Sequence, residues 1–101
     1  MPPSNNKKMI KVNEYFGGDV KSLGYETTDG KATVGVMEEG DYQFSTTSME
    51  IMKVIEGKLE VQLPGETDYK AYIKGEFFEV PAGVSFKVRS VGQSSYHCQF
   101  R

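Results

Sequence analysis

The sequence has little of several features that would narrow its function. Its 101 residues include one cysteine, Cys98, and one histidine, His97. A single cysteine excludes an intrachain disulfide framework and is compatible with a reducing cytoplasm. No apolar run approaches the roughly 20 residues that span a bilayer, and residues 1–8 lack the apolar segment of a signal peptide. We therefore expect a cytoplasmic protein with no membrane partner.

An excess of positive charge is also missing. The formal net charge is −2, and 26% of the residues are charged. These values are typical of an ordinary soluble protein rather than one that coats a polyanion. We therefore expect no nucleic-acid polymer among its partners.

The residues that are present predict one all-β domain. Short runs rich in Val, Ile, Tyr, Phe and Thr alternate with turns that contain Gly, Asp, Asn or Pro. Residues 1–9 offer little to bury, which predicts a flexible tail before a single domain at 10–101. The expected strands are residues 19–26, 31–38, 41–47, 50–56, 58–63, 69–74, 76–80, 84–90 and 94–100. Nine short strands are typical of a barrel or sandwich.

The stretch from Gly75 to Gly83 carries the first recognisable motif. It has a glycine, five residues, a proline, one residue and a glycine, a spacing that resembles the second sequence motif of the cupin family. This resemblance implies a single-domain jelly-roll β-barrel. In cupins that bind metal, the third residue after the final glycine is a histidine ligand, and here that position is Phe86.

The first cupin motif corresponds to the stretch from Gly40 to Gly57. Thr46 and Ser48 occupy the positions of its two histidines, and Glu50 occupies the position of its glutamate. A hydroxyl is a poor ligand for the metals that such sites hold. We therefore expect no metal and no cofactor. His97 is expected to be a partly exposed strand residue, and Cys98 a small core residue.

Alternation along the strands predicts which side chains face the barrel interior. Tyr42, Phe44, Thr46 and Ser48 share one strand face. Further residues predicted to face inward are Glu50, Met52, Val54, Phe78, Val80, Phe86 and Val88. Such an apolar bowl with a few polar groups is typical of a binding site, although aromatic side chains also simply fill small barrels. An interior carboxylate at Glu50 indicates either a ligand-binding group or part of a structural network.

Beyond these motifs, the chain resembles the pyrimidine/purine nucleoside phosphorylases, a family of small single-domain cupins. The matching residues are Asn13–Phe16, Val20–Ser22, Gly30–Met37, Gly40, Tyr42, Phe44–Thr46, Glu50, Met52, Gly57, Val80–Pro81, Ser85–Phe86, Ser95–Tyr96 and Cys98. The resemblance implies phosphorolysis of a broad set of nucleosides to free base and ribose 1-phosphate. It also implies a metal-free reaction, with inorganic phosphate as co-substrate, in a cytoplasmic homodimer.

Phosphorolysis assigns expected roles to the interior residues. Glu50 suits the ribose hydroxyls or the developing positive charge, and we expect Glu50 and Thr46 to be catalytic. The expected substrate-binding residues are Tyr42, Phe44, Ser45, Ser48, Met52 and Phe86. Stacking on aromatic rings tolerates every base and would give broad specificity.

The phosphate cation is harder to assign from the sequence. Lys21 and Lys31 are the candidates, and their alternative role is that of solvated surface lysines. The alternative function for the whole chain is a metal-free cupin that binds a small molecule or nucleotide without catalysis. Unpaired edge strands of an open barrel favour a homodimer.

Overall fold

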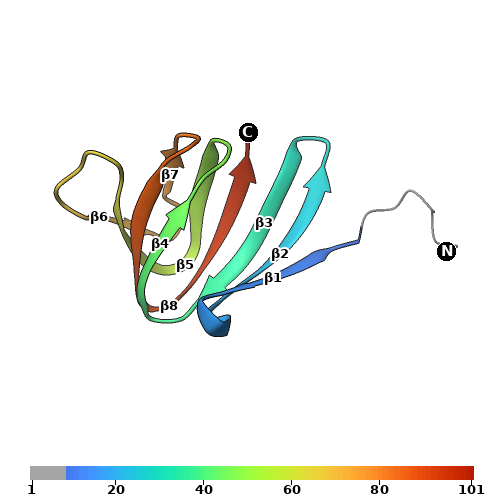
Figure 1. Ribbon diagram of the computed structural model, residues 1–101. Coiled ribbons are helices and arrows are strands. Elements are labelled where there is room, and N and C mark those ends of the chain that lie inside the picture. The colour runs from blue at the N-terminus through green and yellow to red at the C-terminus, as the bar shows by residue number, and fades with distance from the viewer. Residues whose placement is uncertain (1–8) are drawn as a thin grey trace, which may run out of the picture.

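A computed structural model describes residues 9–101 as an antiparallel, all-β cupin fold (Figure 1). The elements are β1 (Lys11–Tyr15), the 3-10 turn η1 (Phe16–Gly18), β2 (Val20–Thr27), β3 (Gly30–Met37), β4 (Gly40–Ser45), β5 (Glu50–Gln62), β6 (Lys70–Ile73), β7 (Phe77–Val80) and β8 (Ser85–Phe100). The hydrogen-bonded order is β1-β2-β3-β8-β5-β6, while β4 pairs with β8 and β7 with β5. None of the helical structure in residues 9–101 is long and apolar enough to cross a membrane. The predicted tail falls mainly on residues 1–8, outside the described residues.

Two long strands, β5 and β8, connect the two halves of the barrel. The first half of β8 pairs with β4 and with the end of β5, and its second half pairs with β3 and with the start of β5. The prediction of separate strands at 50–56 and 58–63, and at 84–90 and 94–100, was therefore wrong. Gly57 and Gly92 do have positive φ, of 90° and 72°, but they bend continuous strands instead of reversing the chain. The register shifts around Gly57 mark this bend as a β-bulge.

The interior of the barrel is filled by the side chains that strand alternation placed there. Met52, Val54, Phe78 and Val80 are buried, as alternation predicted. Aromatic rings continue this core in a chain of contacts with centroid separations of 4.8 to 6.4 Å, formed by Phe16, Tyr42, Phe44, Phe86, Phe78 and Tyr72. The aromatic part of the interior therefore lies mainly at the end of the barrel that β4, β6 and β7 close.

Strand β1 was absent from the sequence prediction. It pairs with β2, with Lys11 opposite Gly24 and Tyr15 opposite Val20. Its inner-face side chains are Lys11, Asn13 and Tyr15, so it lacks the apolar alternation that marks a core strand. This polar inner face leaves the β1-β2-β3 end of the barrel open.

Candidate functional site

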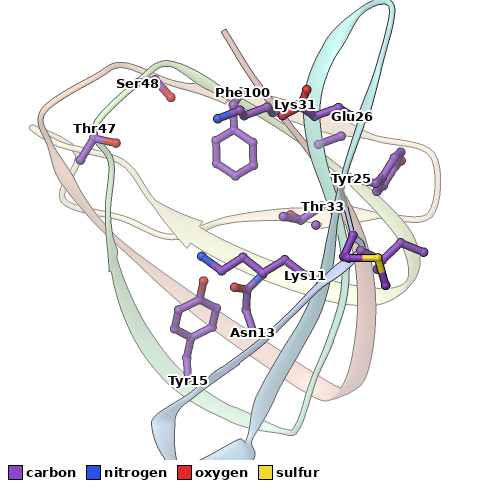
Figure 2. A pocket seen from close by; sticks show the side chains of 14 residues that line it. Lys11, Asn13, Tyr15, Tyr25, Glu26, Lys31, Thr33, Thr47, Ser48 and Phe100 are labelled. Carbon is purple, nitrogen blue, oxygen red and sulfur yellow. The ribbon is translucent and has the colours of Figure 1, made fainter. Parts of the chain in front are cut away.

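An open groove of about 1150 Å³ lies against β1, β2 and β3. Figure 2 shows Lys11, Asn13 and Tyr15 of β1 extending into the view from one side, with Thr47 and Ser48 of the β4–β5 loop on another. The groove therefore lies between the edge of the sheet and this loop, away from the aromatic core.

One row of the sheet beneath the groove carries a glycine, Gly24, and so has no side chain at that position. Cross-strand pairing places Lys11 beside Gly24, Gly24 beside Thr33, and Thr33 beside Cys98. Paired residues project from the same face of a sheet. A Cβ at Gly24 would lie 3.6 Å from the Lys11 Cβ and 3.7 Å from the Asn13 Nδ2. The missing side chain at Gly24 therefore leaves space between the β1 side chains and the sheet.

The adjacent row brings a cation, an aromatic ring and a carboxylate onto the same face. Phe100 pairs with Glu50, and the register that pairs Ala32 with Gln99 places Lys31 beside Phe100. Lys31 and Glu50 are thus two strand spacings apart, roughly 10 Å between Cα atoms. Lys31 and Phe100 line the groove, and Glu50 continues their row toward the core.

Glu50 is half-buried, and its carboxylate oxygen Oε1 accepts a hydrogen bond of 3.3 Å from the Cys98 thiol. Burial raises the pKa of Glu50, while the hydrogen bond from Cys98 lowers it. Burial also raises the pKa of the Cys98 thiol, as does the nearby Glu50 charge. The thiol therefore stays protonated as a donor, and the carboxyl group takes up a proton at a higher pH than an exposed glutamate does.

The two predicted phosphate lysines lie on opposite faces of the sheet. Lys31 lines the groove, whereas Lys21 lies on the outer face, 4.0 Å from the Glu14 carboxylate. Lys11, which sequence reasoning did not single out, joins Lys31 in the groove. Within residues 9–101, neither Lys11 nor Lys31 makes an ion pair. The groove therefore presents two lysines together with the Glu26 carboxylate, which lies opposite Lys31 on β2.

Of the predicted hydroxyl groups, Ser48 lies in the groove. Thr46 is only 5% exposed, and its Oγ1 donates to the Pro81 carbonyl at 2.6 Å and accepts from the Val84 N–H at 3.2 Å. These bonds fasten the β7–β8 turn, which is a structural task. Ser45 is exposed, and its Oγ lies 3.0 Å from that of Ser85.

Most of the predicted substrate-binding side chains belong to the core instead of the groove. Tyr42, Met52 and Phe86 are buried, and Tyr42 donates its hydroxyl hydrogen to the Glu38 carbonyl at 2.7 Å. Phe44 packs against this cluster as a partly buried ring. These placements match the alternative interpretation, in which aromatic side chains fill the barrel.

Three rings that line the groove were not predicted as site residues: Tyr25, and the inner-face rings Tyr15 and Phe100. Signals for Tyr15 and Phe100 were present in the sequence. Phe100 shares the period of Tyr96 and Cys98, and Tyr15 lies in one of the blocks that match the phosphorylase family.

Metal ligands were also sought in the structure. Within residues 9–101, no group of three or more His, Cys, Asp or Glu side chains is arranged to hold a metal ion. The absence of a metal requirement stays a prediction.

Comparisons with known proteins place this geometry in context. The family model described as pyrimidine/purine nucleoside phosphorylase matches residues 10–100. A pyrimidine/purine nucleoside phosphorylase of Aeromonas salmonicida is 50% identical, over 91% of this chain and 98% of the relative. One of Pseudomonas syringae pv. syringae is 46% identical, over 92% and 100%.

Solved structures agree on the fold. A protein of unknown function from Vibrio parahaemolyticus has a TM-score of 0.87 at 41% identity, over 90% of this chain and 97% of that one. An RmlC-like cupin from Shewanella frigidimarina has a TM-score of 0.69 at 18% identity, over 96% and 90%. This second likeness shows the fold alone.

Proposed function

Because the chain belongs to the pyrimidine/purine nucleoside phosphorylase family, we propose that it cleaves purine and pyrimidine nucleosides with inorganic phosphate. The products are the free base and ribose 1-phosphate. One observation carries the location of the reaction: Lys31, Phe100 and Glu50 form a row on the inner face of three neighbouring strands, beside an open groove. Phosphate needs a cation, the base can stack on an aromatic ring, and the ribose hydroxyls need a carboxylate acceptor.

The chemistry follows from the charges in the groove. A phosphate oxygen forms a bond to the anomeric carbon, the glycosidic C–N bond breaks with its electron pair on the base, and the base takes up a proton. Lys31 and Lys11 hold the phosphate by charge-assisted hydrogen bonds. Ionised Glu50 accepts from the ribose hydroxyls and stabilises the positive charge that develops on the sugar.

The same groove accounts for broad specificity. Tyr15 and Phe100 offer aromatic faces for the base. Stacking depends little on base identity because every base has a π face. Both purine and pyrimidine nucleosides are therefore substrates in this proposal.

The first test compares Lys31 with Lys21, the two lysines that the sequence analysis gave together as candidate phosphate ligands. Base release is measured for a panel of nucleosides over a range of phosphate concentrations, with Lys31→Ala and Lys21→Ala as a matched pair. We expect Lys31→Ala to raise the KM for phosphate at least about tenfold, equivalent to about 1.4 kcal/mol, and Lys21→Ala to leave it unchanged. Equal effects would contradict the placement of phosphate in the groove.

Absence of release from every nucleoside, with and without phosphate, would favour the alternative. The chain would then be a metal-free cupin that binds a small molecule or nucleotide without reacting it. Binding of nucleosides to the unreactive protein, measured by calorimetry, would support that alternative directly.

The reaction is proposed to need no metal. Thr46, Ser48 and Phe86 stand where metal-binding cupins have imidazoles, and these side chains are poor ligands. We expect activity to survive dialysis against a chelator. Loss of activity that a divalent metal restores would overturn this part of the proposal.

We also propose a cytoplasmic homodimer that associates through the outer face of the sheet. Val12, Leu23 and Val34 form an aliphatic row across β1, β2 and β3, and Leu23 is 48% exposed. Contiguous apolar side chains of this kind mark association surfaces. Light scattering should give a dimer mass for the wild type and a monomer mass for Leu23→Asp. Ile73→Asp, on β6, is the matched control and should stay dimeric.

A further inference from the structure

The side-chain partner of Glu50 is unusual. Cys98 is 3% exposed, and its Sγ lies 3.3 Å from the Glu50 Oε1. Met52 pairs with Cys98 and Phe100 with Glu50, so the thiol and the carboxylate are diagonal neighbours on the inner face of β8 and β5. Their contact is therefore fixed by strand register and does not depend on a flexible loop.

The Cys98 thiol donates a hydrogen bond to one of the two oxygens of the Glu50 carboxyl group. Within residues 9–101, the Cys98 thiol is the one side-chain hydrogen-bond partner that the structure gives to the Glu50 carboxyl group. On its other flank Glu50 pairs with Val80, which is apolar and buried. No hydrogen bond from residues 9–101 reaches the second oxygen, Oε2, so this oxygen can accept one from a ligand.

We propose that Cys98 is a positioning residue, whose thiol holds one oxygen of the Glu50 carboxyl group so that the other oxygen faces the sugar. This inference rests on the proposed function for the identity of the sugar. The contact between the two side chains is independent of it. The hydrogen bond from the thiol orients the carboxyl group and also favours its ionised form, although a thiol is a weak donor.

The titratable groups that face Glu50 are few. They are Cys98 and Tyr96 on β8, with Lys31 on β3 and Glu26 on β2 in the same row; β7 contributes the apolar Val80. Burial raises the pKa of Tyr96 to about 12, and that of Cys98 is raised as well. Both groups stay protonated at ordinary pH, so neither contributes to a titration on the acid side.

Removal of the Cys98 thiol should change the pKa of Glu50 in a predictable direction. The Cys98 hydrogen bond lowers the pKa of Glu50, so Cys98→Ala raises it. Since ionised Glu50 is the active form, the acid limb of the pH profile of kcat/KM moves to higher pH. Cys98→Ser restores a donor of similar size, and a hydroxyl is the stronger donor. Its acid limb stays in place or moves to lower pH.

The experiment compares wild type, Cys98→Ala and Cys98→Ser in two ways. The first is the pH profile of kcat/KM for phosphorolysis, with folding of each variant checked by its unfolding transition. At about pH 5, we expect Cys98→Ala to lose at least about threefold relative to wild type, and the loss to disappear toward about pH 8. Cys98→Ser should rescue activity on the acid side.

The second readout is the carbon-13 NMR titration of the Glu50 carboxyl group, assigned with Glu50→Gln. It requires no activity, so a failure of the proposed function would not disguise the result. An upward displacement in Cys98→Ala with its return in Cys98→Ser supports the inference. An unchanged titration in Cys98→Ala, or a loss of kcat/KM that is equal at every pH, overturns it.

Discussion

A methyl group added at Gly35 should be costly, because a tyrosine ring occupies its place. Gly35 lies on the inner face of β3 opposite Tyr96. A Cβ at Gly35 would stand 2.5 Å from the ring atom Cζ and from the hydroxyl oxygen of Tyr96, and 2.7 Å from Cε1. Tyr96 is 6% exposed and its hydroxyl is hydrogen-bonded to Ser22, so the ring has no free space to enter.

The expected cost of Gly35→Ala follows from this overlap. Overpacking of a filled interior typically costs about 1–3 kcal/mol, and we expect about 2 kcal/mol here. For a domain of this size, that loss corresponds to a fall of roughly 10 °C in Tm. Urea unfolding gives the free energy of unfolding, and thermal unfolding by circular dichroism gives the Tm.

Gly24 provides the matched control. It also lies on the inner face, but a Cβ there would meet nothing closer than 3.6 Å, which is ordinary contact. We expect Gly24→Ala to change the free energy of unfolding by less than about 0.5 kcal/mol. If both variants lost the same stability, the cost would come from strand glycines in general, and the argument from the Tyr96 ring would be refuted.

Three further predictions concern the groove and its carboxylate. Gly24→Leu should leave the fold intact but lower kcat/KM several-fold by filling the groove floor; unchanged kinetics would place the reaction elsewhere. Since burial raises the pKa of Glu50 above its ordinary 4.5, ionising it costs stability. Glu50→Gln should therefore gain stability over wild type as the pH rises from about 4.5 through the raised pKa. A pH-independent difference in urea unfolding would contradict this. Thr46→Val should lose about 1–3 kcal/mol, measured against exposed Ser45→Ala, while kcat of the folded protein stays within about twofold; a collapse of kcat would restore Thr46 as a catalytic residue.

Strand alternation predicted the core well because the buried side chains of β7 and of the first half of β8 recur with a period of two, although the apolar Phe77 is 59% exposed. Phe78, Val80, Phe86 and Val88 are all buried as expected. The cupin motif that spans this region also located the sharp turn between the two strands. Pattern and packing agree here because the buried side chains of these strands fill the barrel.

The strand prediction failed at Gly57, because a glycine can mark either a turn between two strands or a bulge within one strand. Gly57 was interpreted as a turn between two strands, but it forms a bulge within β5. A Cβ at Gly57 would lie 2.5 Å from the Ser94 Oγ, so the glycine permits a close approach of β5 and β8. One sequence carries no information about such a distant contact, because the contact depends on the register of a strand more than 30 residues away.

The candidate groove was the least predictable part. Strand β1 places Lys11, Asn13 and Tyr15 on its inner face, and polar side chains at these positions erase the apolar pattern by which strands are found. The prediction therefore searched for the site among Tyr42, Phe86 and other core side chains. Polar side chains of this kind depart from the folding pattern, so a candidate site built from them is found from the structure and not from periodicity.

The most direct test of the central claim is the identity of the sugar product. Uridine and adenosine are incubated with the protein and phosphate, and the products are followed by phosphorus-31 and proton NMR. We expect ribose 1-phosphate and free base to form in equal amounts, and Glu50→Gln to slow both at least about tenfold. Free ribose, or the absence of any cleavage, would contradict the account.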